Sequence, residues 1–328
     1  MTRWERMSDA LRWCREEGIT AKGHPLVWAC RSGVPPWLRG LPEEQTEELL
    51  RARVLNLVRG FAGRIDLWDV VNEAVNVRTW RSKIANFDDP NDWDVREEIP
   101  AIADYVDPAF RWAHGANPGA TFLLNEYNTI ARPPVRERFL ALVRELQARG
   151  TPLSGLGIQA HEPREHWYPP EELWGTLDAL AATGLPLHIT ELHPQSSGKP
   201  ITGGWREGAW TEEAQAEFTE QLVRLCFGHP AVASITWWGL SDRRIWLPGG
   251  GLVDAEYRPK PVFERLRRLR EEWTTRLEAR TDAEGGVSFR GFFGDYELTV
   301  TPPDGRTRTF AVRVRSDEEN RWAFTLRD

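Results

Sequence analysis

The sequence predicts a parallel β/α barrel followed by a small all-β module, and three observations lead to that prediction. Through most of the 328 residues, short apolar runs that suit buried strands alternate with longer amphipathic stretches that suit helices. The candidate strands end in polar or aromatic residues, as expected where strand ends converge on one face of a barrel. The sequence has no glycine-rich phosphate loop, which would favour a doubly wound sheet instead.

The candidate strands are short, and the stretches between them are long enough for helices. Thr211, followed by two glutamates, is a suitable helix start, and Gly150 and Gly184 are suitable helix ends. Strands are expected at residues 19–28, 65–72, 121–125, 155–159, 186–190 and 234–238. Helices are expected at residues 3–17, 43–61, 133–149, 171–183 and 212–227.

A TIM barrel has eight strands, whereas the sequence offers six and opens directly in a helical stretch. Either two strands escape notice, or a (β/α)8-type barrel lacks its first two strands before Met1. The pattern changes near Trp273, so we expect a barrel domain over residues 1–273 and a small β-sandwich-like accessory module over residues 274–328. Short strands of the module are expected at residues 277–281, 287–289, 296–300, 309–314 and 322–326.

Composition argues against several classes of partner. The net charge of −7 argues against nucleic acid, because phosphate binding needs a basic surface. No apolar run approaches the roughly 20 residues that cross a membrane, and the N-terminal residues carry no secretory signal. Three scattered cysteines do not suit a thiolate metal site, and neither a metal nor a cofactor is expected. Seventeen tryptophans are either core residues or platforms on which sugars stack.

Two predicted strands run directly into a glutamate. Glu73 follows the apolar run at 68–72, and Glu191 follows the run at 187–190. A buried carboxylate is costly without a partner, so each glutamate alone is more simply interpreted as half of an ion pair with an arginine. Together they match what a glycosidase needs, since one carboxyl group protonates the leaving oxygen while the other stabilises or attacks the sugar.

Seven short motifs include these glutamates. They are Gly-His-Pro-Leu-Val-Trp at 23–28, Trp-Asp-Val-Val-Asn-Glu-Ala at 68–74, Asn-Glu-Tyr-Asn at 125–128, Gly-Leu-Gly-Ile-Gln-Ala-His at 155–161, Ile-Thr-Glu-Leu at 189–192, Thr-Trp-Trp-Gly-Leu-Ser-Asp at 236–242 and Tyr-Arg-Pro-Lys-Pro at 257–261. In this order they resemble the family-10 glycoside hydrolases, the xylanase family, over roughly residues 1–273.

The resemblance implies a retaining mechanism with Glu73 as acid/base and Glu191 as nucleophile. Asn72 is expected to hydrogen-bond the sugar at the nucleophile, while Gln159 and His161 position Glu191 and the same sugar. The other expected substrate contacts are His24 and Trp28 as donors at the non-reducing-side subsite, Trp238 and Trp246 as its walls, and Tyr127 and His193.

The mechanism implied by the resemblance requires the two glutamates to titrate differently. Glu73 must start protonated, so we expect its pKa to lie above the ordinary glutamate value of about 4.3. Partial burial and the negative charge of Glu191 both act in that direction. Retention of configuration predicts carboxyl groups about 5–5.5 Å apart, whereas a separation above about 6.5 Å predicts inversion.

Three positions depart from the family pattern. Ala29 stands where the family usually has histidine, and Glu126 replaces the usual aspartate, which is a modest change. His193 stands where the family usually has an aspartate that pairs with the counterpart of His161. We expect His193 to hydrogen-bond Glu191 or His161 and to shift the pH optimum.

The leading functional hypothesis is an endo-β-1,4-xylanase that acts on xylan or xylooligosaccharides. One alternative is a hydrolase of a related β-glucan, because the motifs define the chemistry better than the sugar. Another is a non-catalytic or weakly active protein that binds xylan or xylooligosaccharides, since two barrel strands are missing from the predicted set. The resemblance implies an extracellular protein, and neither nucleic acid nor a membrane is expected as a partner.

Overall fold

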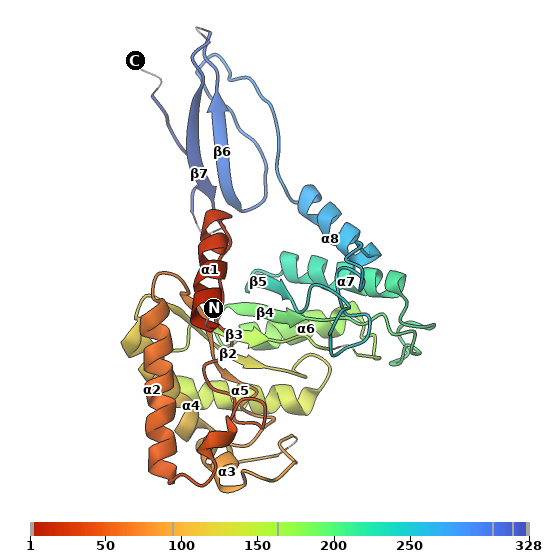
Figure 1. Cartoon of the computed structure of the whole chain (residues 1–328). Helices are drawn as coiled ribbons and strands as arrows, with labels where there is room; N and C mark the ends of the chain where they lie inside the picture. Colours follow the sequence, from red (N-terminus) through yellow and green to blue (C-terminus); the bar gives the residue numbers. More distant parts are fainter. Residues whose placement is uncertain (1–2, 94, 163, 304, 317, 326–328) are drawn as a thin grey trace. The chain divides into compact units, whose positions relative to one another are not determined.

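The computed structural model describes every residue except 1–2, 94, 163, 304, 317 and 326–328 (Figure 1). Its contacts divide the chain into two compact units, Met1–Phe263 and Glu264–Asp328, which are described separately. The division falls inside one helix, α8 (Pro261–Glu272). The domain boundary predicted after residue 273 therefore differs from the contact-based division and stays a prediction.

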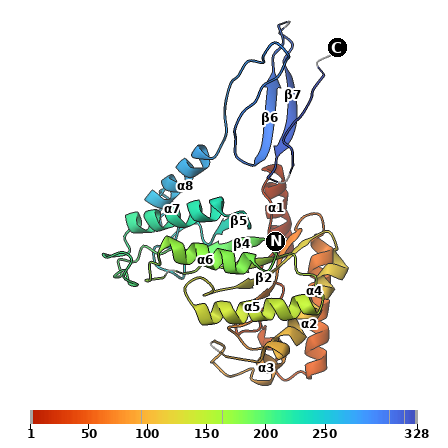
Figure 2. The ribbon, with the colours of Figure 1, turned by 180° about the vertical axis from the view of Figure 1, so that it is seen from behind.

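The first unit is built on a parallel sheet in which strand order follows the sequence. Its helices pack on the strands they connect: α4 contacts β1 and β2, α6 contacts β4, and α7 contacts β5. Seen from behind, α5 and α6 lie in front of the strands (Figure 2). The strands are β1 (Leu67–Asn72), β2 (Thr121–Glu126), β3 (Gly155–Ile158), β4 (Leu187–Leu192) and β5 (Val232–Trp237).

The predicted strand at residues 19–28 is present only as irregular pairing with β1. Gly23 and Val27 form isolated parallel bridges with Trp68 and Val71. Pro25 has no backbone N–H to donate, which breaks the ladder between the two bridges. Gly23 is needed for the close approach, because a Cβ there would lie 2.1 Å from the Trp68 ring. Within the described residues, this segment and β5 form the two edges of the sheet.

The helices predicted from periodicity are confirmed, and three further α-helices were missed. Positive φ angles at Gly150 and Gly184 follow α5 and α6, as predicted for helix ends. The missed α4 contains Pro108, a residue type that usually kinks or breaks a helix interior. The helices of this unit are α1 (Arg3–Glu16), η1 (Pro36–Leu38), α2 (Glu43–Phe61), α3 (Trp80–Ala85), α4 (Ile99–Ala116), α5 (Pro133–Ala148), α6 (Pro170–Ala181) and α7 (Glu212–Gly228). In the described part of the chain, no helix is long and apolar enough to cross a bilayer.

The second unit contains an antiparallel pair, β6 (Gly294–Val300) and β7 (Arg308–Val314). The small β module is thus confirmed at two of its predicted strands. Residues 277–281 and 287–289 form no strands, and the chain between them makes a turn in which the Asp282 carboxylate accepts the backbone N–H groups of Glu284 and Gly286. The predicted strand at 322–326 is irregular up to residue 325, and its last residue lies outside the described residues.

Candidate active site

The carboxyl ends of β1 to β4 bring a set of buried polar side chains together. Asn72 ends β1 and pairs in register with Asn125 of β2, so their side chains lie next to each other. Gln159 directly follows β3, and Glu191 lies near the end of β4. All four side chains are buried. Parallel strands place their carboxyl ends at one edge, which is why residues far apart in sequence meet here.

Two amide groups join the two predicted catalytic glutamates. Gln159 Nε2 donates to Glu73 Oε1 at 2.9 Å and to Asn72 Oδ1 at 3.1 Å. Asn125 Nδ2 donates to the same Asn72 oxygen at 2.8 Å and to Glu191 Oε1 at 2.8 Å. The Asn72 oxygen therefore accepts two hydrogen bonds. Among the described residues its amide nitrogen has no acceptor, so this end of Asn72 is left to donate to a ligand.

Asn125 is an orienting residue that was not among the predicted site residues. The Thr190 hydroxyl donates to Asn125 Oδ1 at 2.6 Å, which aims the amide nitrogen at Glu191. A Cβ at Gly157 would lie 2.3 Å from the same oxygen, so only glycine leaves room for this amide. The sequence signal was present, because Asn125 ends a predicted strand and opens a motif.

Glu73 is held in an uncommon backbone conformation directly after β1. Its φ of 62° lies in the left-handed region, which costs a non-glycine residue roughly 1–3 kcal/mol and is found mainly at functional sites. Its backbone N–H donates to the Asn125 carbonyl at 2.8 Å, and Trp28 Nε1 donates to Glu73 Oε2 at 2.9 Å. The conformation is thus fixed from both the backbone and the side chain.

The pKa of Glu73 is raised above its ordinary value. Burial is the main cause, and the negative charge of Glu191 adds to it. Hydrogen bonds from Gln159 and Trp28 act in the opposite direction by stabilising the ionised carboxylate. The rise agrees in direction with the expectation for a group that starts the reaction protonated.

Glu126 supports the turn that follows Glu73. Its carboxylate is fully buried and accepts from the Val75 N–H at 2.9 Å, Asn76 Nδ2 at 2.8 Å and the Tyr127 N–H at 2.9 Å. Burial raises the pKa of Glu126 to about 8, with a further contribution from the charge of Glu73 and opposition from these donors. The longer side chain that replaces the family's aspartate is therefore fully used inside the protein.

Glu191 is contacted by groups from three separate segments of the chain. Besides Asn125 on Oε1, His161 Nε2 lies 2.9 Å from Oε2. His24 Nδ1 lies 3.7 Å from Oε1 and 2.8 Å from Asp69 Oδ2. Lys22 Nζ contacts that Asp69 oxygen at 2.6 Å. The nucleophile candidate is thus surrounded by hydrogen-bond donors.

His24, Asp69 and Glu191 form the one group among the described residues that offers three possible metal-ligand atoms, all within 4.8 Å of one another. The ammonium group of Lys22 already provides a positive charge to Asp69. The group is therefore explained as a hydrogen-bonded ion-pair network without a metal.

His193 is fully buried behind His161. The ring centroids of the two histidines lie 5.6 Å apart, and the Trp246 ring lies 5.7 Å from His193. Burial lowers the pKa of His193 to about 3, with His161 and Lys260 acting in the same direction, so its ring is neutral. Among the described residues, neither nitrogen of His193 nor His161 Nδ1 has a hydrogen-bond partner. The expected hydrogen bond from His193 to Glu191 or His161 is absent from the described contacts.

Two groups of aromatic rings flank the glutamates. Trp238 and Trp246 lie edge-on to His161, with ring centroids 5.9 and 5.2 Å away. On the Glu73 side, the Trp93 ring lies 6.2 Å from Trp28 and 6.4 Å from Tyr127. Trp93 was not predicted, because it lies in a loop without a motif. All predicted site residues fall in this connected set: His24, Trp28, Asn72, Glu73, Tyr127, Gln159, His161, Glu191, His193, Trp238 and Trp246.

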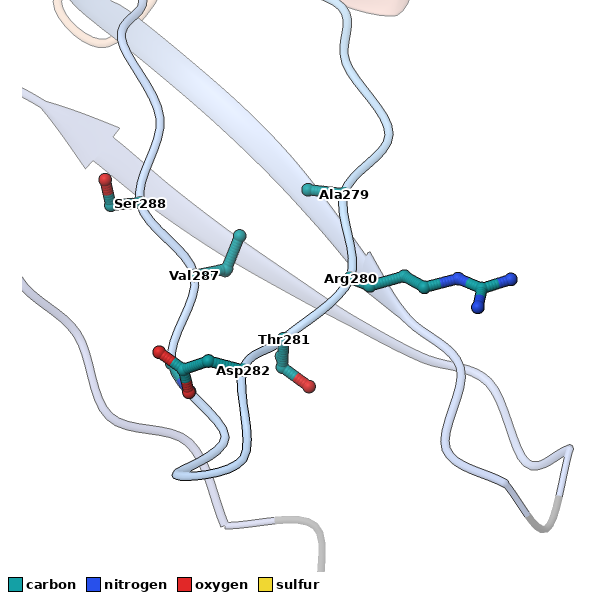
Figure 3. Close-up of a pocket in the computed structure, with 7 residues that line it drawn as sticks. Ala279, Arg280, Thr281, Asp282, Val287 and Ser288 are labelled. Carbon is teal, nitrogen blue, oxygen red and sulfur yellow. The ribbon is translucent and has the colours of Figure 1, made fainter.

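A hollow in the second unit does not resemble a catalytic site. It is lined by residues 279–282 and 286–288, and Figure 3 shows Val287 beside it and the Arg280 side chain extending away. Its carboxylate, Asp282, is already engaged by the backbone of its own turn. Among the described residues, the candidate catalytic groups therefore lie in the first unit.

Comparisons with known proteins match most of the chain. The family model "Glycosyl hydrolase family 10" matches residues 1–269. Endo-1,4-beta-xylanase B of Thermotoga neapolitana is 33% identical over 262 residues, which cover 76% of this chain and 69% of that protein. Endo-1,4-beta-xylanase 2 of Arabidopsis thaliana is 27% identical over 304 residues, which cover 91% of this chain. The match spans only 25% of the plant protein's length.

Solved structures agree on the fold. The crystal structure of xylanase 10B from Thermotoga petrophila in complex with xylobiose superposes with a TM-score of 0.66 and 26% identity. The match covers 83% of this chain and 80% of that one. The predicted TIM-barrel class is thereby confirmed, together with a small antiparallel sheet near the C-terminus.

Proposed function

The chain belongs to glycosyl hydrolase family 10, and from this premise we propose that it is a retaining endo-β-1,4-xylanase that cleaves internal bonds of xylan. The observation that carries the proposal is the pair of buried glutamates, Glu73 and Glu191, joined through Asn72 by the amides of Gln159 and Asn125. A buried carboxyl pair held by neutral amides is arranged for acid/base and nucleophilic work rather than for an ion pair with arginine.

In the first step, Glu191 attacks the anomeric carbon while protonated Glu73 donates its proton to the leaving oxygen. The raised pKa of Glu73 supports this role. Once Glu191 is a neutral glycosyl ester, its charge no longer opposes ionisation of Glu73. Glu73 then removes a proton from water, which hydrolyses the ester and restores both groups.

Asn72 binds the sugar in this proposal. Its oxygen is occupied by two amides, so its nitrogen is directed to the 2-hydroxyl, whose hydrogen bond strengthens in the transition state. His161 contacts Glu191 and orients it, while Trp238 and Trp246 enclose His161 and wall the glycone side. His193 supports His161 from behind, because it is fully buried.

Xylan is the proposed substrate because the similar proteins are named xylanases and one is described with xylobiose bound. Since xylan is a polymer, we place the reaction outside the cell. The purified full chain is tested on xylan and on carboxymethylcellulose, with Glu191→Gln as the inactive control. We expect faster release of reducing ends from xylan, and a preference for the glucan would overturn the substrate assignment.

The stereochemistry of the first product tests the mechanism independently of the substrate. Proton NMR of an early reaction mixture should show the β-anomer before mutarotation, because two displacements retain configuration. An initial α-anomer would contradict the double displacement. Binding of xylooligosaccharides without any cleavage would instead favour the non-catalytic alternative.

Trp28→Phe is expected to move the basic limb of the kcat/KM profile to higher pH. The indole N–H stabilises the ionised form of Glu73, so its removal raises the pKa of Glu73 further. Activity falls as pH rises through that pKa, because only protonated Glu73 donates. The limb should therefore move up by roughly half to one pH unit, the usual effect of one such hydrogen bond.

The measurement is kcat/KM on a xylooligosaccharide from the neutral into the alkaline range. Trp174→Phe, on the outer surface of α6, serves as the matched control and should leave the limb in place. A limb that stays fixed or moves to lower pH in Trp28→Phe would count against Glu73 as the acid.

A further inference from the structure

An exposed tryptophan is anchored beside the acid/base by a buried ion pair. The Trp93 side chain is 42% exposed, whereas its neighbour Asp92 is 2% exposed and Lys83 of α3 is 1% exposed. Lys83 Nζ lies 2.6 Å from Asp92 Oδ1, and the Arg31 backbone N–H donates to Asp92 Oδ2 at 2.6 Å. A large apolar side chain at the surface is thus held by some of the most deeply buried charges in the unit.

The buried pair fixes the path of the loop rather than adding much stability. Taking two charges out of water costs about as much as their attraction returns, so such pairs often serve to specify one conformation. A second restraint is the antiparallel bridge between Val77 and Trp93. The chain is therefore tied down both at Asp92 and at Trp93 itself.

The Trp93 ring lies on the leaving-group side of the site. It packs edge-on against Tyr127 at an interplanar angle of 83° and lies beside Trp28. Trp28 was predicted as a donor at the non-reducing-side subsite, but in the structure its N–H donates to Glu73, so its ring belongs to the Glu73 side. Glu73 delivers its proton to the leaving oxygen, so rings on its side face the departing half of the chain. The rings that surround His161, next to Glu191, belong to the other half.

We infer that Trp93 is a stacking platform for a sugar of the leaving-group half of a β-1,4-linked xylose chain. Xylopyranose rings present flat C–H faces that match an exposed indole held in one orientation. This inference rests on the proposed function and adds a residue that sets the preferred chain length. Because the Lys83–Asp92 pair holds the platform in place before substrate arrives, little ordering is needed on binding.

Trp93→Ala tests the inference on two substrates. On xylohexaose we expect kcat/KM to fall about tenfold, the scale of one aromatic stacking contact. On 4-nitrophenyl β-xylobioside, which has no sugar beyond the scissile bond, kcat/KM should change less than about twofold. The cleavage pattern of reducing-end-labelled xylohexaose should also shift, because one leaving-group position loses its binding energy. Trp93→Phe should restore most of the loss.

Trp174→Ala is the matched control, since Trp174 is 37% exposed on α6 and its ring contacts His229 edge-on rather than any residue of the candidate active site. Equal losses of Trp93→Ala on both substrates would overturn the inference, because they would point to an indirect effect through Trp28 and Glu73. Unchanged kinetics on both would also overturn it.

Calorimetry separates this inference from the proposed function. If the wild-type chain cleaves neither substrate, the proposed function fails, but xylohexaose binding can still be compared between the wild type and Trp93→Ala. The platform predicts about tenfold weaker binding in the variant. Equal affinities would overturn it.

Discussion

Glu191→Ala is expected to lower kcat on xylan by about four orders of magnitude or more, the range found when a covalent nucleophile is removed. Without the carboxylate no glycosyl ester can form, and no other described carboxyl group hydrogen-bonds both Asn125 and His161. The variant should fold, because Asn125 and His161 can turn to water in the opened space. Activity is measured on xylan and on an activated aryl xylobioside, and both rates should fall.

Azide distinguishes a missing nucleophile from a disturbed site. In Glu191→Ala the small anion can enter the vacated space and attack the anomeric carbon directly, so an activated aryl substrate should yield the α-glycosyl azide. Glu162→Gln provides a control, since Glu162 is also buried but accepts a backbone hydrogen bond from Ile130. Activity within tenfold of wild type in Glu191→Ala would exclude Glu191 as the nucleophile.

Glu73→Ala is expected to show the second-largest effect, and its size should depend on the leaving group. On xylan, which needs its leaving oxygen protonated, kcat/KM should fall by about three orders of magnitude, within the range assigned to general acid catalysis. On a 2,4-dinitrophenyl xylobioside the first step needs no acid, so kcat/KM should fall far less. The basic limb of the pH profile should disappear as well, because it reports the ionisation of Glu73.

Reaction with azide provides an independent test of the role of Glu73 in Glu73→Ala. With the base missing, the glycosyl ester on Glu191 accumulates, and azide should release it as the β-glycosyl azide with retained configuration. Gln159 donates a hydrogen bond to Glu73, and Gln159→Ala provides a contrast. In this variant kcat/KM should fall to a similar extent on both substrates. Equal losses on xylan and the dinitrophenyl substrate in Glu73→Ala would contradict the acid role.

The glutamates could be proposed from the sequence because each belongs to a strand-end motif, and their catalytic roles came from the resemblance to the family. Glu73 and Glu191 each follow an apolar run, and parallel strands bring such ends together. The network between them was only partly predictable. Asn72 and Gln159 belong to motifs, but the orientation of the Asn125 amide depends on Thr190 and Gly157, which lie on two other strands.

The features that were not predicted from the sequence depend on contacts between segments that are distant in the chain. α4 was missed, and it contains Pro108, which usually breaks a helix; here the helix continues past it with a buried apolar face. Trp93 lies in a loop without periodicity, and its position follows from an ion pair between Lys83 and Asp92. Residues 19–28 have strand composition, but Pro25 interrupts their pairing with β1.

At Glu73, the residue that favours catalysis differs from the residue that favours thermal stability, because the backbone there is left-handed. Glycine or asparagine would occupy a φ of 62° with less strain, so the residue that best suits the backbone is one that cannot donate a proton. If Glu73 is the acid/base, as proposed, selection for cleavage is what keeps glutamate there. In a lineage freed from that selection, or in a laboratory screen for heat resistance alone, this position should be among the first to drift, leaving an intact fold that no longer cuts its polymer.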